Sequence, residues 1–130
     1  MVTESPSATP IRNHRDLVVW QRAMDLVAEV YRLTDRFPAD ERYGLVQQVK
    51  RAVVSIPSNI AEGHGWDHLG DYLRHLSVAN GSLMEVETQF GIAVRLGYLR
   101  AEDTGKFFEE AAEIGRMLAG LVRALKRRRP

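Results

Sequence analysis

Apolar residues return at every third or fourth position through four long stretches of the chain, which is the period of an amphipathic α-helix. These stretches predict helices at residues 13–36, 40–63, 67–97 and 103–126. The connections between them are short, and short connections favour antiparallel neighbours. The pattern therefore predicts an all-α fold, an antiparallel, up-and-down four-helix bundle at residues 13–126.

The first predicted helix, residues 13–36, carries two apolar seams. One seam is Leu17, Trp20, Met24, Val27 and Tyr31, and the other is Val19, Ala23, Leu26, Val30 and Leu33. A surface helix of a monomer needs a single apolar stripe of about 100° or somewhat more. Two interpretations remain open. The additional seam faces a neighbouring subunit of a homo-oligomer, or the helix is central and is covered on both sides within one bundle.

The second predicted helix, residues 40–63, contains a proline within its apolar period. Pro57 lacks a backbone N–H and its ring clashes with the carbonyl of Val53, so we expect the helix to bend or loosen at this turn. Gly63 and Gly65 are expected to end the helix, because glycine adopts a left-handed backbone at little cost. The small polar residues available to satisfy the freed carbonyl are Ser55, Ser58 and Asn59.

Individual polar residues add predictions about the helices. The expected N-terminal caps are Asn13 or Asp16, Asp40, Asp67, and Asp103 or Thr104. In the third helix Glu85 and Glu87 flank the apolar Val86, so both cannot reach water if the helix is packed on two sides. We expect one of these glutamates to be partly buried and paired with Arg51.

The composition is that of one ordinary globular domain. The chain has 130 residues, of which 45% are apolar and 27% are charged, and it has no cysteine. Disulfides, thiolate catalysis and cysteine-bound metal clusters are therefore excluded. Residues 1–12 are predicted to be a disordered leader, and residues 127–130 a basic tail. Because a signal peptide and any run of about 18 apolar residues are lacking, we expect a cytoplasmic protein with no membrane partner.

Side chains that bind metals or carry out catalysis form no recognised motif here. No glutamate has a histidine three residues later, as the di-iron helical bundles require. His68, Asp71 and His75 share one helix face and are weak candidates for a metal site, since no fourth ligand is near in sequence. A nucleophile elbow and a phosphate-binding glycine loop are also missing. We therefore expect no enzymatic activity and no cofactor.

Positive charge is concentrated at the end of the last predicted helix. The formal net charge is only +1, so any nucleic-acid surface must be local. Such a basic run either is a solvated helix end that complements the helix dipole, or binds a nucleic-acid backbone through counterion release. The candidate nucleic-acid-binding residues are Lys50, Arg51, Arg123, Lys126, Arg127, Arg128 and Arg129.

Several motifs in a fixed order resemble one protein family. They are DLVVWQ at 16–21, YRLT at 31–34, RAVVSIPSNIAEG at 51–63, LSVA at 76–79, GSL at 81–83, EVETQ at 85–89 and LGYL at 96–99. Together they resemble the four-helix-bundle proteins encoded in 23S rRNA intervening sequences. The chain is also similar to the accessory variability protein of diversity-generating retroelements.

The resemblance implies a four-helix bundle that assembles into a ring-like homopentamer without enzymatic activity. Its retroelement branch implies partners of two kinds, nucleic acid and a reverse transcriptase. The chain departs from the family pattern at Trp66 and Asn80, where relatives often carry arginine or lysine. Both departures remove positive charge, which predicts weaker nucleic-acid binding or none.

Two functions are consistent with these patterns. The leading hypothesis is a non-enzymatic homo-oligomer, a pentamer, that binds RNA, DNA or another nucleoprotein partner through its basic residues. The alternative is a protein-interaction scaffold with no nucleic-acid binding, which is favoured by the doubled seam of residues 13–36 and by the small net charge.

Overall fold

The computed structural model describes residues 11–65 and 68–128. These residues form α1 (Val18–Thr34), α2 (Leu45–His64), α3 (Leu69–Arg95) and α4 (Gly105–Lys126). Three short 3-10 helices stand before α1, α2 and α4, namely η1 (His14–Asp16), η2 (Ala39–Glu41) and η3 (Ala101–Asp103). The described part of the chain contains no strand, so the predicted all-α class is confirmed.

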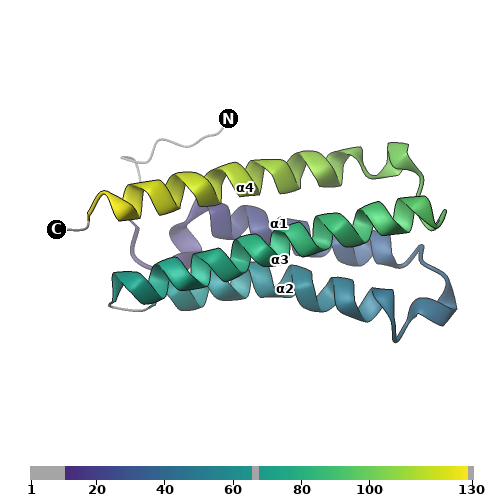
Figure 1. Cartoon of the computed structure of the whole chain (residues 1–130), viewed down its shortest axis with the longest axis horizontal. Helices are drawn as coiled ribbons and strands as arrows, with labels where there is room; N and C mark the ends of the chain where they lie inside the picture. The colour runs from purple at the N-terminus through teal and green to yellow at the C-terminus, as the bar shows by residue number, and fades with distance from the viewer. Residues whose placement is uncertain (1–10, 66–67, 129–130) are drawn as a thin grey trace.

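The four helices lie side by side along the long axis of the molecule (Figure 1). The α1–α2 and α3–α4 connections share one end. The opposite end of the molecule contains the start of α1, the end of α2, the start of α3 and the end of α4, and we call it the α4 end (Figure 1). The contact between α2 and α3 is the most extensive, whereas α4 packs less extensively on both α1 and α3.

The core is a continuous apolar cluster to which all four helices contribute. Phe90 of α3 stacks on Phe107 of α4 with a centroid separation of 4.1 Å, and Phe37 packs beside Phe90. Of the two seams of α1, the one that is buried is Val19, Ala23, Leu26, Val30 and Leu33. The other seam is only partly covered, and Met24 and Tyr31 on it are 45% and 40% exposed. Within one chain, therefore, α1 has one covered seam and one that is open in part.

The expected cap at Asn13 forms, but it caps the start of the short helix η1 and not the start of α1. The Asn13 side chain accepts a hydrogen bond from the Arg15 N–H, and Asp16 accepts from the Asn13 N–H, which completes a capping box. Leu17 then adopts an extended backbone, so α1 begins only at Val18. The Asp16 carboxylate accepts hydrogen bonds from the backbone N–H groups of Arg12 and Asn13, and these bonds lower its pKa from the usual value.

The prediction that Asp40 caps the second helix is wrong. The residue before α2 is Gly44, and the side chain of Glu41 accepts a hydrogen bond from the Leu45 N–H. The other carboxylate oxygen of Glu41 accepts from the Tyr98 hydroxyl at 2.7 Å. Glu41 thus ties the start of α2 to the α3–α4 connection, a long-range contact that the local sequence does not reveal.

Neither remaining cap is formed by a side chain within the described residues. Asp67 lies outside them, and α3 begins at Leu69 after His68 without a side-chain cap. Thr104 precedes α4, but its hydroxyl donates back to the Ala101 carbonyl. Asp103 accepts a hydrogen bond from Arg36 at 3.0 Å, so the prediction of a capping side chain there is also wrong.

The glycines at the end of α2 differ from expectation. Gly65 ends the helix with a right-handed backbone, φ −77°. Gly63 lies inside α2 and is buried, and a Cβ placed on it would lie 2.8 Å from the Cβ of His75 on α3. Gly63 therefore allows α2 and α3 to approach closely. Gly97 is the glycine with a left-handed backbone among the described residues, φ 80°.

Pro57 lies within α2, which continues on both sides of it. The small polar residues beside it do not hydrogen-bond to the Val53 carbonyl among the bonds of the described residues. The Asn59 amide instead donates to the carbonyl and the hydroxyl of Ser55, at 2.8 and 2.9 Å.

The expected pairing of Arg51 with a glutamate is wrong. Arg51 makes no ion pair among the described residues, and Glu85 accepts a hydrogen bond from Gln89.

Candidate nucleic-acid interface

The predicted basic residues fall into two separate groups. Lys50 and Arg51 lie near the start of α2, at the end of the molecule opposite to the α4 end (Figure 1). Arg123 and Lys126 lie on the last turns of α4, and Arg127 and Arg128 follow them and are exposed. Arg129 is outside the described residues. One chain therefore does not bring all of the candidate residues into one surface.

The group on α2 is engaged with neighbouring side chains. The Lys50 ammonium lies over the Tyr31 ring, 4.6 Å from its centroid, and Lys50 is partly buried. Arg51 lines a cavity of about 190 Å³ together with Ser55, Ser82 and Glu85. Because a carboxylate shares this cavity with the guanidinium, the local potential is less positive than the sequence pair suggests.

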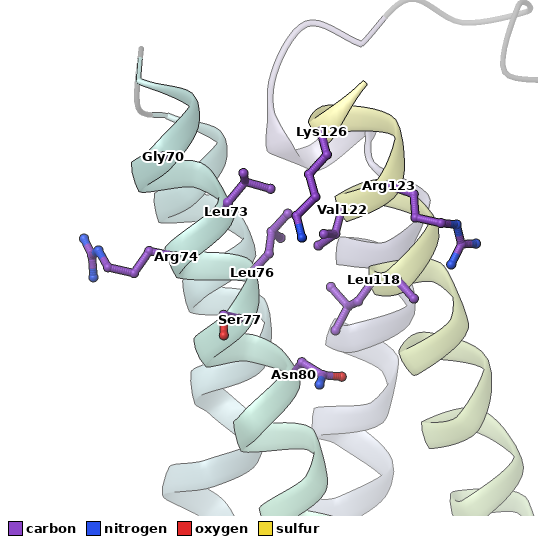
Figure 2. A pocket seen from close by; sticks show the side chains of 11 residues that line it. Gly70, Leu73, Arg74, Leu76, Ser77, Asn80, Leu118, Val122, Arg123 and Lys126 are labelled. Atoms are coloured by element: carbon purple, nitrogen blue, oxygen red, sulfur yellow. The ribbon is translucent and has the colours of Figure 1, made fainter. Parts of the chain in front are cut away.

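The group on α4 borders a groove between α3 and α4. The groove has a volume of about 730 Å³ and is lined by Gly70, Leu73, Arg74, Leu76, Ser77, Asn80, Leu118, Ala119, Val122, Arg123 and Lys126. The leucines of α3 and the apolar residues of α4 point toward one another across it (Figure 2). The Lys126 side chain extends into the groove, whereas Arg74 and Arg123 point outward on either side (Figure 2).

The cations of this groove have little intramolecular neutralisation. Arg123 and Lys126 form no ion pair among the described residues. Arg74 reaches Asp71 at 3.7 Å, and its side chain is 61% exposed. An exposed pair at that separation contributes little attraction. The described residues of the α4 end therefore present positive charge that no carboxylate among them neutralises closely.

Of the three glutamates of α4, in contrast, Glu110 and Glu113 are paired with arginines, and Glu109 is not paired among the described residues. Arg22 of α1 donates to Glu110 at 3.0 Å. Arg116 donates to Glu113, and this hydrogen bond lowers the pKa of that carboxyl from its usual value. The sequence shows the acidic start and the basic end of α4 equally clearly, and only the structure shows that the two differ in neutralisation.

Sequence analysis missed Arg74 as a member of this surface. It is isolated in the sequence, with histidine and leucine as neighbours. The spacing of Gly70, Arg74 and Ser77 places them on one face of the helix. That this face borders a groove follows only from the position of α4. Of the two departures from the family pattern, Asn80 lines the groove, and Trp66 is outside the described residues.

The weak metal candidates are not gathered into a site. His75 is 9% exposed, and its Nδ1 lies 2.9 Å from the side-chain oxygen of Asn59. Asp71 pairs with Arg74, and His68 is exposed at the start of α3. Over the described ranges, no three histidine, aspartate or glutamate side chains are arranged to hold a metal ion.

A partly buried polar network joins α2 to α3 near the predicted metal ligand His75. The hydroxyls of Ser55 and Ser82 lie 2.9 Å apart, and Asn59 connects Ser55 to His75. Nearby, His64 Nδ1 lies 3.2 Å from the Tyr72 hydroxyl. Burial lowers the pKa of His64 and raises that of Tyr72. These groups satisfy one another, so we assign the network a structural role.

The comparisons with known proteins agree with this fold. A protein of unknown function from the S23 ribosomal protein family of Bacteroides thetaiotaomicron has a similar crystal structure, with a TM-score of 0.75 and 20% sequence identity. The similarity covers 82% of this chain and 96% of that one. No curated protein matches the chain significantly. None of the helices in the described ranges is long and apolar enough to cross a membrane. Residues 15–120 match the 23S rRNA-intervening sequence proteins, and the chain belongs to that family.

Proposed function

We propose that this protein is a non-enzymatic accessory protein that binds RNA, alone or within a nucleoprotein complex. The observation that carries the proposal is the cationic α4 end, where Arg123 and Lys126 have no carboxylate partner among the described residues. Arg127 and Arg128 extend the same surface and are exposed. Exposed cations of this kind bind phosphates by releasing the counterions condensed on a nucleic acid.

The chemistry of this surface favours contact with the nucleic-acid backbone over base recognition. Its described basic residues are on or after the last turns of a helix, and none of the described residues that line the neighbouring groove is aromatic. Base stacking requires such rings, whereas phosphate contacts require only positive charge. We therefore expect binding with little sequence preference and a strong dependence on salt.

The proposal includes an antiparallel, up-and-down bundle that assembles into a homo-oligomer, a pentamer as the resemblance implies. The partly exposed seam of α1 supports self-association, because Trp20, Met24 and Val27 line a cavity of about 360 Å³ with Val54 and Pro57 of α2. Apolar surface of this kind is usually covered by another molecule. A closed ring would repeat the α4 end once per subunit and so multiply weak phosphate contacts.

A protein-interaction scaffold is the alternative function. It is supported by exposed apolar side chains on the outer face of α3, where Val78, Met84 and Ile92 are 44%, 58% and 41% exposed. A reverse transcriptase or another nucleoprotein component is the class of partner that the resemblance implies. In this alternative the basic α4 end would serve only for solubility.

The test is binding of a structured RNA and of duplex DNA to the full chain across a salt series, after light scattering has fixed the oligomeric mass. We expect binding that weakens steeply with salt and weakens further when residues 127–130 are removed. Charge reversal of Lys106, which is exposed in the first turn of α4, is the matched control and should change little. Absence of binding at low salt from an intact oligomer would favour the scaffold.

A further inference from the structure

We propose that the groove between α3 and α4 is a docking site for an acidic amphipathic helix of a partner protein. This goes beyond RNA binding, because a phosphate backbone needs only the cations at the α4 end and makes no use of the apolar floor between them. The groove has an apolar floor, the length of a short helix and positive charge on both sides.

The floor is aliphatic. Leu76 of α3 and Leu118 of α4 are 1% and 2% exposed and close the bottom of the groove. Leu73 and Val122 are partly exposed and form its walls (Figure 2). Within residues 11–65 and 68–128, no aromatic residue lines the groove. The described lining is therefore aliphatic and small, which suits the aliphatic side chains that an amphipathic helix inserts into such grooves.

The groove is long enough for several helical turns. Its lining on α3 extends from Gly70 to Asn80, which is about 15 Å at the rise of an α-helix. Small residues on its rim, Ser77 and Ala119, leave room for another backbone to approach. A Cβ added to Gly70 would meet nothing within 4 Å, which shows free space beside the rim. About three turns of a partner helix would fit this length.

The charges surround the apolar strip. Lys126 enters the groove, and Arg74 and Arg123 point outward from its two sides (Figure 2). The complementary ligand is a helix with an apolar stripe flanked on both sides by glutamate or aspartate. A second copy of this chain is a poorer complement, because its α4 has only Glu109 as a glutamate that is not paired with an arginine among the described residues.

The probe for this site is a fluorescein-labelled peptide of about four helical turns, with leucine on one face and glutamate on both flanks. Its binding to the full chain is measured by fluorescence anisotropy. The comparison peptides carry lysine in place of glutamate, or the same residues in scrambled order. We expect the acidic helix to bind at least about tenfold more tightly than either comparison peptide.

Two pairs of variants locate the binding. Ala119→Trp fills the groove without changing charge, and Ala112→Trp is its control on α4, exposed and outside the groove. Arg74→Glu combined with Arg123→Glu reverses the flanking charge, and Lys106→Glu is its control. We expect a loss of about tenfold or more for Ala119→Trp and for the double reversal, and little change for the controls.

The outcomes distinguish this proposal from the proposed function. Acidic-peptide binding that is lost in Ala119→Trp while RNA binding remains would support a protein site separate from phosphate contacts. Equal binding of all three peptides, or full retention by Ala119→Trp, would overturn it. It would also be overturned if Ala119→Trp lowered the oligomeric mass, because a second copy would then fill the groove, or if it abolished RNA binding as strongly as peptide binding.

Discussion

Gly63 shows how a single residue determines a helix–helix distance. It is buried within α2 where α3 crosses closely, and its missing side chain leaves room for Tyr72 and His75. On α3 the same residue type has a different effect, because a Cβ added to Gly81 would meet nothing within 4 Å. The two glycines therefore make a matched pair.

We expect Gly63→Ala to lower the free energy of unfolding by about 1–3 kcal/mol, since the new methyl group would lie 2.8 Å from the His75 Cβ. Gly81→Ala should raise it by about 0.5–1 kcal/mol, because alanine restricts the unfolded chain and suits a helix interior. Urea unfolding monitored by circular dichroism measures both. Equal effects of the two substitutions would contradict the close approach at Gly63.

At the level of elements, Glu41 fixes the start of α2. One of its oxygens accepts from the Leu45 N–H and the other accepts from the Tyr98 hydroxyl. The hydrogen bond from Tyr98 is the main cause that lowers the pKa of Glu41 from its usual 4.5, and it raises the pKa of Tyr98. The native state thus favours the ionised carboxylate.

We expect Glu41→Gln to lower the melting temperature at pH 7. A lowered pKa in the native state gives stability that is present above the usual value of 4.5 and is lost as pH falls through the native value. The difference in melting temperature from wild type should therefore shrink as the pH falls below 4.5, as thermal melts over a pH series would show.

Two companion variants test this assignment. Tyr98→Phe removes the same hydrogen bond from the other side, so its effect should be non-additive with that of Glu41→Gln. Glu102→Gln, at a side chain that is 69% exposed, is the control and should change little. A constant difference between Glu41→Gln and wild type at every pH would contradict the linkage.

At the level of the whole molecule, the open seam of α1 meets α2 in a cavity that Met24 and Val54 line. These two residues are 45% and 40% exposed, although they are apolar and adjoin the core. If another subunit covers this cavity, charges placed there would have to be buried without partners, which is strongly unfavourable.

We expect Met24→Lys combined with Val54→Lys to reduce the oligomeric mass while the helical content of the chain is retained. Met84→Lys on the outer face of α3 is the control, because Met84 is 58% exposed and lies outside this cavity. Multi-angle light scattering gives the mass, and circular dichroism gives the helical content. An unchanged mass for the double variant would place the subunit interface elsewhere.

The sequence by itself determined the helices and much of the core. Periodicity is local, so Val19 through Leu33 could be recognised as an apolar seam and the four helical segments could be located from neighbours three and four residues apart. The motifs from Asp16 to Leu99 were specific enough to indicate the family that residues 15–120 match. Helix starts were less accurate, because Glu41 binds both a nearby N–H and the distant Tyr98.

Only the tertiary structure decided which surfaces remain available. The two seams of α1 are equally apolar in sequence, and packing alone buries the one that contains Ala23 and leaves Met24 exposed. Pairing across helices neutralises Glu110 but leaves Lys126 without an ion pair among the described residues. The groove joins Leu73 to Val122, residues far apart in the chain. Such contacts depend on how whole helices are placed, and no local period encodes that placement.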